Sequence, residues 1–171
     1  MDEKLSWSKL LTFFEKEYAW APKQKQSLNN TLNIAQVIEF ESKGWQELDA
    51  VKDKFYEYHT RIKSPNASEL DVQDYWLAEQ VVEFFMIQAG PLYRKHWELC
   101  TVDEKVALWQ LAQGAKINPA NAEVVQHLTR RGFIYRDKGW HIINESFRRF
   151  ILTAESAKVI DHWMDSTRSG L

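Results

Sequence analysis

The feature that most constrains the fold of this chain is a series of helix start and stop signals in its second half. Thr101 and Glu104 match the T-x-x-E pattern of a capping box, in which each side chain bonds the backbone of the other residue. Gly114 is placed to end the helix that this box begins, because glycine readily adopts the left-handed conformation that follows many helices. Pro119 favours the start of a second helix, and Gly132 is placed to end it. These signals predict two short helices in close succession.

The segments next to these helices favour extended structure. "AKIN" at 115–118 can form one short extended segment between the helices. "FIYRDKGWHII" at 133–143 alternates apolar and polar residues around Asp137-Lys138-Gly139, which is typical of a hairpin with glycine at a left-handed position. Helix, short strand, helix and two-stranded hairpin is the element order of a winged helix.

Roughly the last 80 residues resemble the winged-helix modules that close bacterial multidomain proteins, including some that follow AAA-type or related P-loop ATPase domains. The resemblance is carried by Tyr93, Trp97, Glu104, Lys105, "LA" at 111–112, "NP" at 118–119, "LTRRGFI" at 128–134 and "NESFRRF" at 144–150. It implies a fragment or relative of a larger protein, with no catalytic domain of its own. The sequence departs from the DNA-binding form of this fold in one respect, because no scaffold helix fits between Gly114 and Pro119. This departure argues against recognition of bases in a DNA groove.

Helical periodicity dominates the first half of the chain. Residues 4–18, 27–62 and 69–89 place apolar side chains at helical spacing. The second of these stretches forms one long helix or two, because Gly44 either kinks it or ends its first part. Gly90-Pro91 is expected to break the third.

The expected fold is mainly α. Only six Gly and four Pro occur in 171 residues, so the chain lacks the turns that an all-β fold needs. We expect a helical bundle over 1–90 and a winged-helix-like domain with a small β-hairpin over 91–153. A terminal helix extension and tail would occupy 154–171.

The stretch "NESFRRFIL" at 144–152 is expected to open a long final helix that reaches about residue 165. Asn144 or Ser146 can cap this helix. One of its faces would pack on the winged helix through Phe147, Phe150, Ile151 and Ala154. A second apolar face is a predicted protein interface, toward the helical bundle or a second chain: Leu152, Val159, Ile160 and Trp163.

The charge is uneven along the chain. Residues 1–91 carry a net charge of −5 and residues 92–171 a net charge of +3, which suggests two modules. The basic half contains six candidate contacts for nucleic acid or an anionic partner: Arg130, Arg131, Arg136, Lys138, Arg148 and Arg149. For Arg130 and Arg131 the alternative is an ordinary role, because cations in a last helical turn complement the helix dipole.

No pattern of an enzyme or of a cofactor or metal site is present. The glycines form neither a P-loop nor a dinucleotide-binding loop, and no two of the five histidines share a metal-ligand spacing. Cys100 is the only cysteine, so no intrachain disulfide can form. We expect no catalytic residues, no cofactor, no small-molecule substrate and no direct membrane insertion. The chain should be cytoplasmic, or the soluble part of a larger, membrane-associated protein.

These observations favour a non-catalytic module for protein interaction or regulation, as the terminal part or a relative of a larger bacterial assembly. Its partner would be another protein or a second copy of the chain. The alternative is a winged-helix DNA-binding transcriptional regulator that dimerises through its terminal helices.

Overall fold

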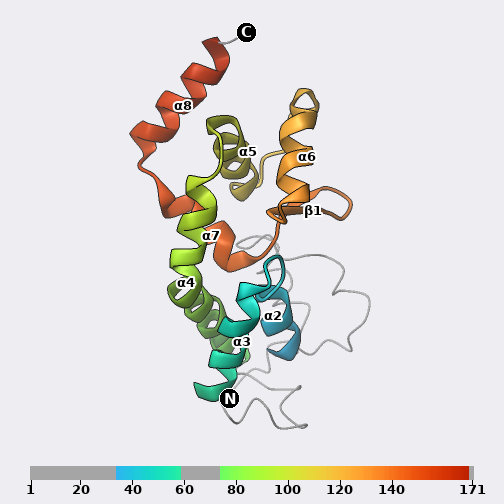
Figure 1. The fold of residues 1–171 in the computed structure, drawn as a ribbon, viewed down its shortest axis with the longest axis vertical. Helices are drawn as coiled ribbons and strands as arrows, with labels where there is room; N and C mark the ends of the chain where they lie inside the picture. The colour runs from blue at the N-terminus through green and yellow to red at the C-terminus, as the bar shows by residue number, and fades with distance from the viewer. Residues whose placement is uncertain (1–33, 59–73, 170–171) are drawn as a thin grey trace, which may run out of the picture. The chain divides into compact units, whose positions relative to one another are not determined.

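The computed structural model describes residues 34–58 and 74–169, and it divides into two compact units. The first unit comprises the described residues up to Ala89 together with Asn144–Ser146. The second unit comprises Gly90–Ile143 and the described residues from Phe147 onward. The described residues form seven α-helices, one 3₁₀ helix and one two-stranded antiparallel sheet (Figure 1), so the expectation of a mainly helical fold is confirmed. The helix predicted over 4–18 lies outside the described residues.

In the first unit, two helices take the place of the long periodic stretch. These are α2 (Ile34–Glu41) and α3 (Glu47–Tyr58), and Gly44 lies between them with a φ of 107°. Glycine tolerates this left-handed backbone, so it ends the first helix here and does not merely bend it. The two helices, their connection and the first part of α4 supply the buried core of this unit: Val37, Ile38, Phe40, Trp45, Leu48, Phe55, Val81, Val82, Phe85 and Ala89.

The prediction that Gly90 and Pro91 break the next helix is wrong, because α4 runs without interruption over Asp74–Glu98. Proline has no N–H, so the carbonyl of Ile87 loses its intrahelical donor. Ile87 is 73% exposed and Pro91 is also exposed, so water can bond that carbonyl. Proline also disfavours a helical conformation of the residue before it, because its ring clashes with the Cβ of that residue. The residue before Pro91 is Gly90, which has no Cβ, so this clash is reduced.

A buried carboxylate in the first unit bonds the N-terminus of α7 (Glu145–Ala154). The Oε1 of Glu41 accepts from the N–H of Glu145 at 3.0 Å, and its Oε2 accepts from the N–H of Ser146 at 2.9 Å. The Nδ2 of Asn144 donates in return to the carbonyl of Glu41 at 3.0 Å. The first N–H groups of a helix have no intrahelical acceptor, and an anion is favoured there by the helix dipole. Glu41 therefore supplies the acceptor from a distant part of the chain.

In the second unit, the predicted start and stop signals of two helices are confirmed. Helix α5 (Val102–Ala112) begins at Thr101 with both bonds of the capping box, which Glu104 completes. It ends with bonds from the N–H of Gly114 to the carbonyl of Leu111 and from Ala115 to Gln110. This is the Schellman pattern, with Gly114 at a φ of 83°.

The second helix of this unit follows the same logic. Pro119 opens a short 3₁₀ helix, η3 (Pro119–Asn121), which leads into α6 (Ala122–Arg130). Gly132, at a φ of 76°, closes α6 through a bond from its N–H to the carbonyl of Thr129. Phe133 then bonds the carbonyl of Leu128, and both side chains are fully buried. The stop signal thus also sets the first core residue of the hairpin.

The hairpin consists of β1 (Ile134–Arg136) and β2 (Trp140–Ile142), paired antiparallel with Arg136 opposite Trp140. The prediction of a left-handed glycine in its turn is wrong, because Lys138 has the positive φ of 56° and Gly139 does not. The short extended segment at 115–118 pairs with no strand among the described residues.

The prediction of one long final helix is wrong. The segment forms two helices, α7 and α8 (Ala157–Ser169), shown in orange and red in Figure 1. Side chains of α4 hold the break between them. Both terminal nitrogens of Arg94 donate to the carbonyl of Ala154 at 3.2 Å, and the Nε1 of Trp97 donates to the Oε1 of Glu155 at 2.9 Å. The Arg94 bonds satisfy a backbone carbonyl at the end of α7 from outside the helix. The Trp97 bond holds the side chain of the residue that follows the helix.

The protonation of Glu41 generates a testable dependence of stability on pH. Burial raises the pKa of its carboxyl from 4.5 to about 7, against the hydrogen bonds from Ser146 that favour the ionised form. The folded protein therefore binds this proton more tightly than the unfolded chain does. This proton therefore stabilises the folded protein, by roughly 3 kcal/mol at most. Its contribution to the free energy of unfolding is complete below the unfolded pKa of 4.5 and is lost as the pH rises through the folded pKa of about 7.

We expect the free energy of unfolding, measured by urea denaturation, to fall between about pH 5 and about pH 8 in the wild type and much less in Glu41→Gln, which cannot ionise. Glu39→Gln is the matched control, because Glu39 lies on the same helix and is exposed. Parallel pH profiles of wild type and Glu41→Gln would show that this carboxyl does not titrate in that range.

Candidate functional site

Two of the six predicted basic residues are bound within the second unit. The Nη1 of Arg131 donates to the Oε2 of Glu104 at 2.9 Å, and the guanidinium lies 4.7 Å from the centre of the Phe133 ring. The side chain of Glu104 is only 4% exposed, so its charge requires this partner. Arg148 donates to the carbonyl of Ala112 at 2.8 Å and so satisfies the end of α5. Arg131 and Arg148 therefore have structural roles.

Three of the other basic residues lie on the surface of the second unit. Arg130 is exposed at the end of α6, and Arg136 and Lys138 are exposed on the hairpin. The guanidinium of Arg136 lies over the ring of Trp140, 5.8 Å from its centre. Arg149, the sixth candidate, is half-buried on α7. The structure thus separates an exposed group of cations from the two that hold helices together.

An open groove of about 710 Å³ lies between α6 and the hairpin, and we call it the α6–hairpin groove. Its lining consists of Ala122, Glu123, Val125, Gln126, Thr129, Arg130 and Trp140. Val125 and Trp140 are half-buried and give it an apolar surface, while Arg130 contributes a positive charge and Glu123 a negative one. Arg136 stands beside it through its contact with Trp140. Sequence reasoning did not single out Trp140, although it directly follows the turn of the predicted hairpin.

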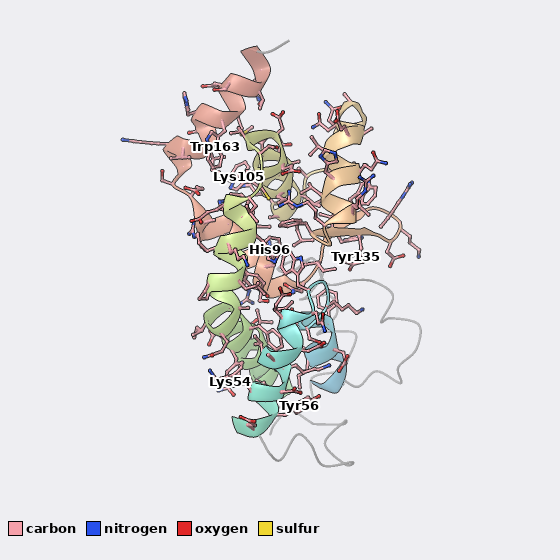
Figure 2. The ribbon with its side chains drawn as sticks, viewed as in Figure 1. Lys54, Tyr56, His96, Lys105, Tyr135 and Trp163 are labelled. Atoms are coloured by element: carbon pink, nitrogen blue, oxygen red, sulfur yellow. The ribbon has the colours of Figure 1, made fainter. Side chains whose placement is uncertain are left out.

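The four residues of the predicted protein interface do not share one exposed face. Ile160 is 2% exposed, so it belongs to the core of its own unit. The ring of Trp163 lies 6.4 Å from that of Trp97. The ammonium of Lys105 lies 5.2 Å from the centre of the Trp163 ring, and both residues are labelled in Figure 2. Leu152 and Val159 are half-buried. Trp163 therefore already packs within the second unit, and an interface through this set stays a prediction.

Two titratable groups of the second unit have pKa values that burial raises. Burial raises the pKa of the Cys100 thiol to about 11, although the charge of Arg131 acts in the opposite direction. The thiol is therefore protonated at neutral pH, and the thiolate that nucleophilic chemistry needs is scarce. Burial also raises the pKa of Tyr135 above its usual value. Within residues 34–58 and 74–169, no group of three His, Cys, Asp or Glu side chains is placed to hold a metal ion. None of the described helices is both long and apolar enough to cross a membrane.

The division of the arginines into bound and exposed ones can be tested on a neighbouring pair. Arg131→Ala removes the guanidinium from the buried Glu104, which keeps only the more distant imidazole of His127, with its Nδ1 3.8 Å from the Oε1 of Glu104. We expect a loss of about 2 kcal/mol in the free energy of unfolding. Arg130→Ala is the control, because an exposed residue beside it should cost less than about 0.5 kcal/mol. Denaturant unfolding of both variants provides the measurement. Equal losses in the two variants would contradict the structural role of Arg131.

The candidate site of this chain is a surface of its second unit. Two features of the described residues bear on function: the α6–hairpin groove and the exposed cations beside it. No family model matches the chain, and no curated protein or solved structure matches it either.

Proposed function

We propose that this chain is a non-catalytic protein-interaction module, and that the α6–hairpin groove of its second unit binds a short acidic segment of a partner protein. The observation that carries the proposal is the half-buried Trp140 in an open, largely apolar groove beside exposed cations. The winged-helix resemblance adds that the module would belong to a larger bacterial assembly, where it would act in regulation.

The arrangement of the second unit supports a winged-helix type of module. Helix α5 contacts α6, which in turn contacts β1 of the hairpin. Although no helix fits between Gly114 and Pro119, α5 stands directly before α6 in the chain and can take the position of the scaffold helix. In this interpretation α6 occupies the place of a recognition helix and the hairpin that of the wing.

The groove has the chemistry of a peptide site. Tryptophan is enriched where protein interfaces concentrate their binding energy, because a large flat ring gains much contact area and loses few rotamers. Trp140 and Val125 can receive an apolar side chain of a partner. Arg130 and Arg136 can each bind a carboxylate through two N–H groups, which makes acidic residues on both sides of that apolar side chain favourable.

A protein partner fits this surface better than DNA does. Glu123 lies in the first turn of α6 and Arg130 in its last turn, and both line the groove. The carboxylates of a short segment can lie beside Arg130 and away from Glu123, whereas a phosphate backbone that follows the groove would also meet the negative charge of Glu123. Arg131 and Arg148, two of the six candidate cations, have structural roles and cannot contribute fully to phosphate binding. Base recognition also needs several polar side chains at the start of the recognition helix, and the start of α6 offers Ala122, Glu123 and Val124.

DNA binding remains the second candidate because of one specific observation. Arg136 and Lys138 are exposed on the hairpin, and Arg130 is exposed at the end of the adjacent helix. Cations on a wing and on a neighbouring helix can bind phosphates on either side of a groove.

Selection from a display library of random peptides on the full chain tests the leading proposal. We expect the enriched peptides to carry acidic residues around an apolar one. Their affinity should fall at least about tenfold in Trp140→Ala and in Arg130→Glu, through the loss of roughly 1.4 kcal/mol or more of binding free energy. Lys158→Glu is the matched charge reversal, because Lys158 is an exposed cation on α8 outside the groove.

Two outcomes would overturn the proposal. Peptides that bind wild type, Trp140→Ala and Arg130→Glu equally would show that the groove is not the site. A mobility shift with duplex DNA at about 50 mM salt, weakened steeply by added salt and by Arg136→Ala with Lys138→Ala, would establish the second candidate in its place.

A further inference from the structure

The second unit contains another cavity, of about 370 Å³, which shares no lining residue with the α6–hairpin groove. Four elements surround it: α5, η3, α6 and α8. Its apolar wall is formed by Val106 of α5, Val124 of α6 and Met164 of α8. Val106 is 7% exposed, so this wall continues into the core of the unit. Cavities of a few hundred Å³ with an apolar wall are the usual size for small organic ligands.

Four polar side chains line the same cavity and have no partner among the described residues. They are Asp103 and Gln110 of α5, Asn121 of η3 and Arg168 of α8. Within the described residues, none of these side chains makes a hydrogen bond or an ion pair, and Asn121 makes no capping bond at the start of α6. Gln110 and Asn121 are half-buried residues, so each gives up part of its contact with water.

The charged residues have an ordinary role that explains only part of this arrangement. Asp103 lies in the first turn of α5 and Arg168 in the last turn of α8, where each complements a helix dipole. That role explains why the residue at the start of α5 is negatively charged and the residue at the end of α8 is positively charged. It does not account for two unpaired amides in the same cavity, or for an acid and a base that line one cavity without bonding each other.

We propose that this cavity binds a small zwitterion with an apolar body, of the amino-acid class. Asp103 would accept hydrogen bonds from its ammonium group, and Arg168 would donate to its carboxylate. The amides of Gln110 and Asn121 would add neutral hydrogen bonds, and the apolar body would contact Val106, Val124 and Met164. A ligand of this class satisfies both charges at once, which neither a simple anion nor a simple cation can do. The proposal does not depend on the function proposed for the groove.

A titration monitored by amide chemical shifts of the isotope-labelled full chain tests this inference. The probes are L-leucine, 4-aminobutanoate and 6-aminohexanoate, in which the distance between the two charges increases. N-acetyl-leucine and leucine methyl ester each lack one charge. We expect saturable shifts with at least one zwitterion at about 10 mM, which suffices for a dissociation constant near 1 mM. The two singly charged probes should bind at least about tenfold more weakly, because one charged contact is lost.

The variants assign the binding to this cavity. Asp103→Asn and Arg168→Gln should each weaken the zwitterion at least about tenfold, and both side chains are exposed, so the fold should tolerate the changes. Asp161→Asn and Lys158→Gln are matched controls, because both residues are exposed on α8 outside the cavity. The inference is wrong if no zwitterion saturates, if the singly charged probes bind equally well, or if the Asp103 and Arg168 variants bind as the controls do.

Discussion

The ion pair between Glu104 and Arg131 is the interaction on which the second unit depends. One buried carboxylate completes the capping box at the start of α5 and also accepts from the guanidinium at the end of α6. Because a charge that is almost fully buried needs a counter-ion, the two helices cannot separate without a large cost. The orientation of α6 against α5 therefore follows from this pair. The α6–hairpin groove and the cavity between α5, η3, α6 and α8 both include residues of α6, so both depend on this orientation.

The parts of the fold that could be predicted from the sequence are those in which a residue acts on its own neighbours. The capping box and the left-handed glycines after α5 and α6 involve bonds within five residues, so a local pattern contains the whole interaction. The wrong predictions concern helix ends that depend on residues far away in the sequence or on solvent. Arg94 and Trp97 of α4 divide the final helix in two, and solvent around Ile87 permits α4 to pass Pro91. No local spacing contains that information.

Sequence alone also could not predict which basic side chains of the candidate surface are exposed. Arg130 and Arg131 are adjacent in the sequence and identical in type, but only Arg131 reaches Glu104. Neighbouring positions at a helix end point in directions about 100° apart, so one arginine can turn inward and the other outward. Sequence reasoning identified a basic cluster and could not divide it. Trp140 and the cavity were missed, because apolar and amide side chains acquire a binding role only when several elements bring them together.

The bond from Glu41 to the start of α7 has a consequence for the order in which the chain can fold. Its donors lie 104 and 105 residues further along the chain, so they leave the ribosome long after Glu41 does. Until then, α2 carries a carboxylate that has to remain hydrated, and closing so long a loop has an entropic cost that later contacts must offset. Contacts of such high sequence separation slow folding, because their loop-closure entropy is lost before the contacts form. A nascent chain that stops before residue 144 therefore contains α2 and α3 in full, but it cannot bury Glu41 as the folded protein does.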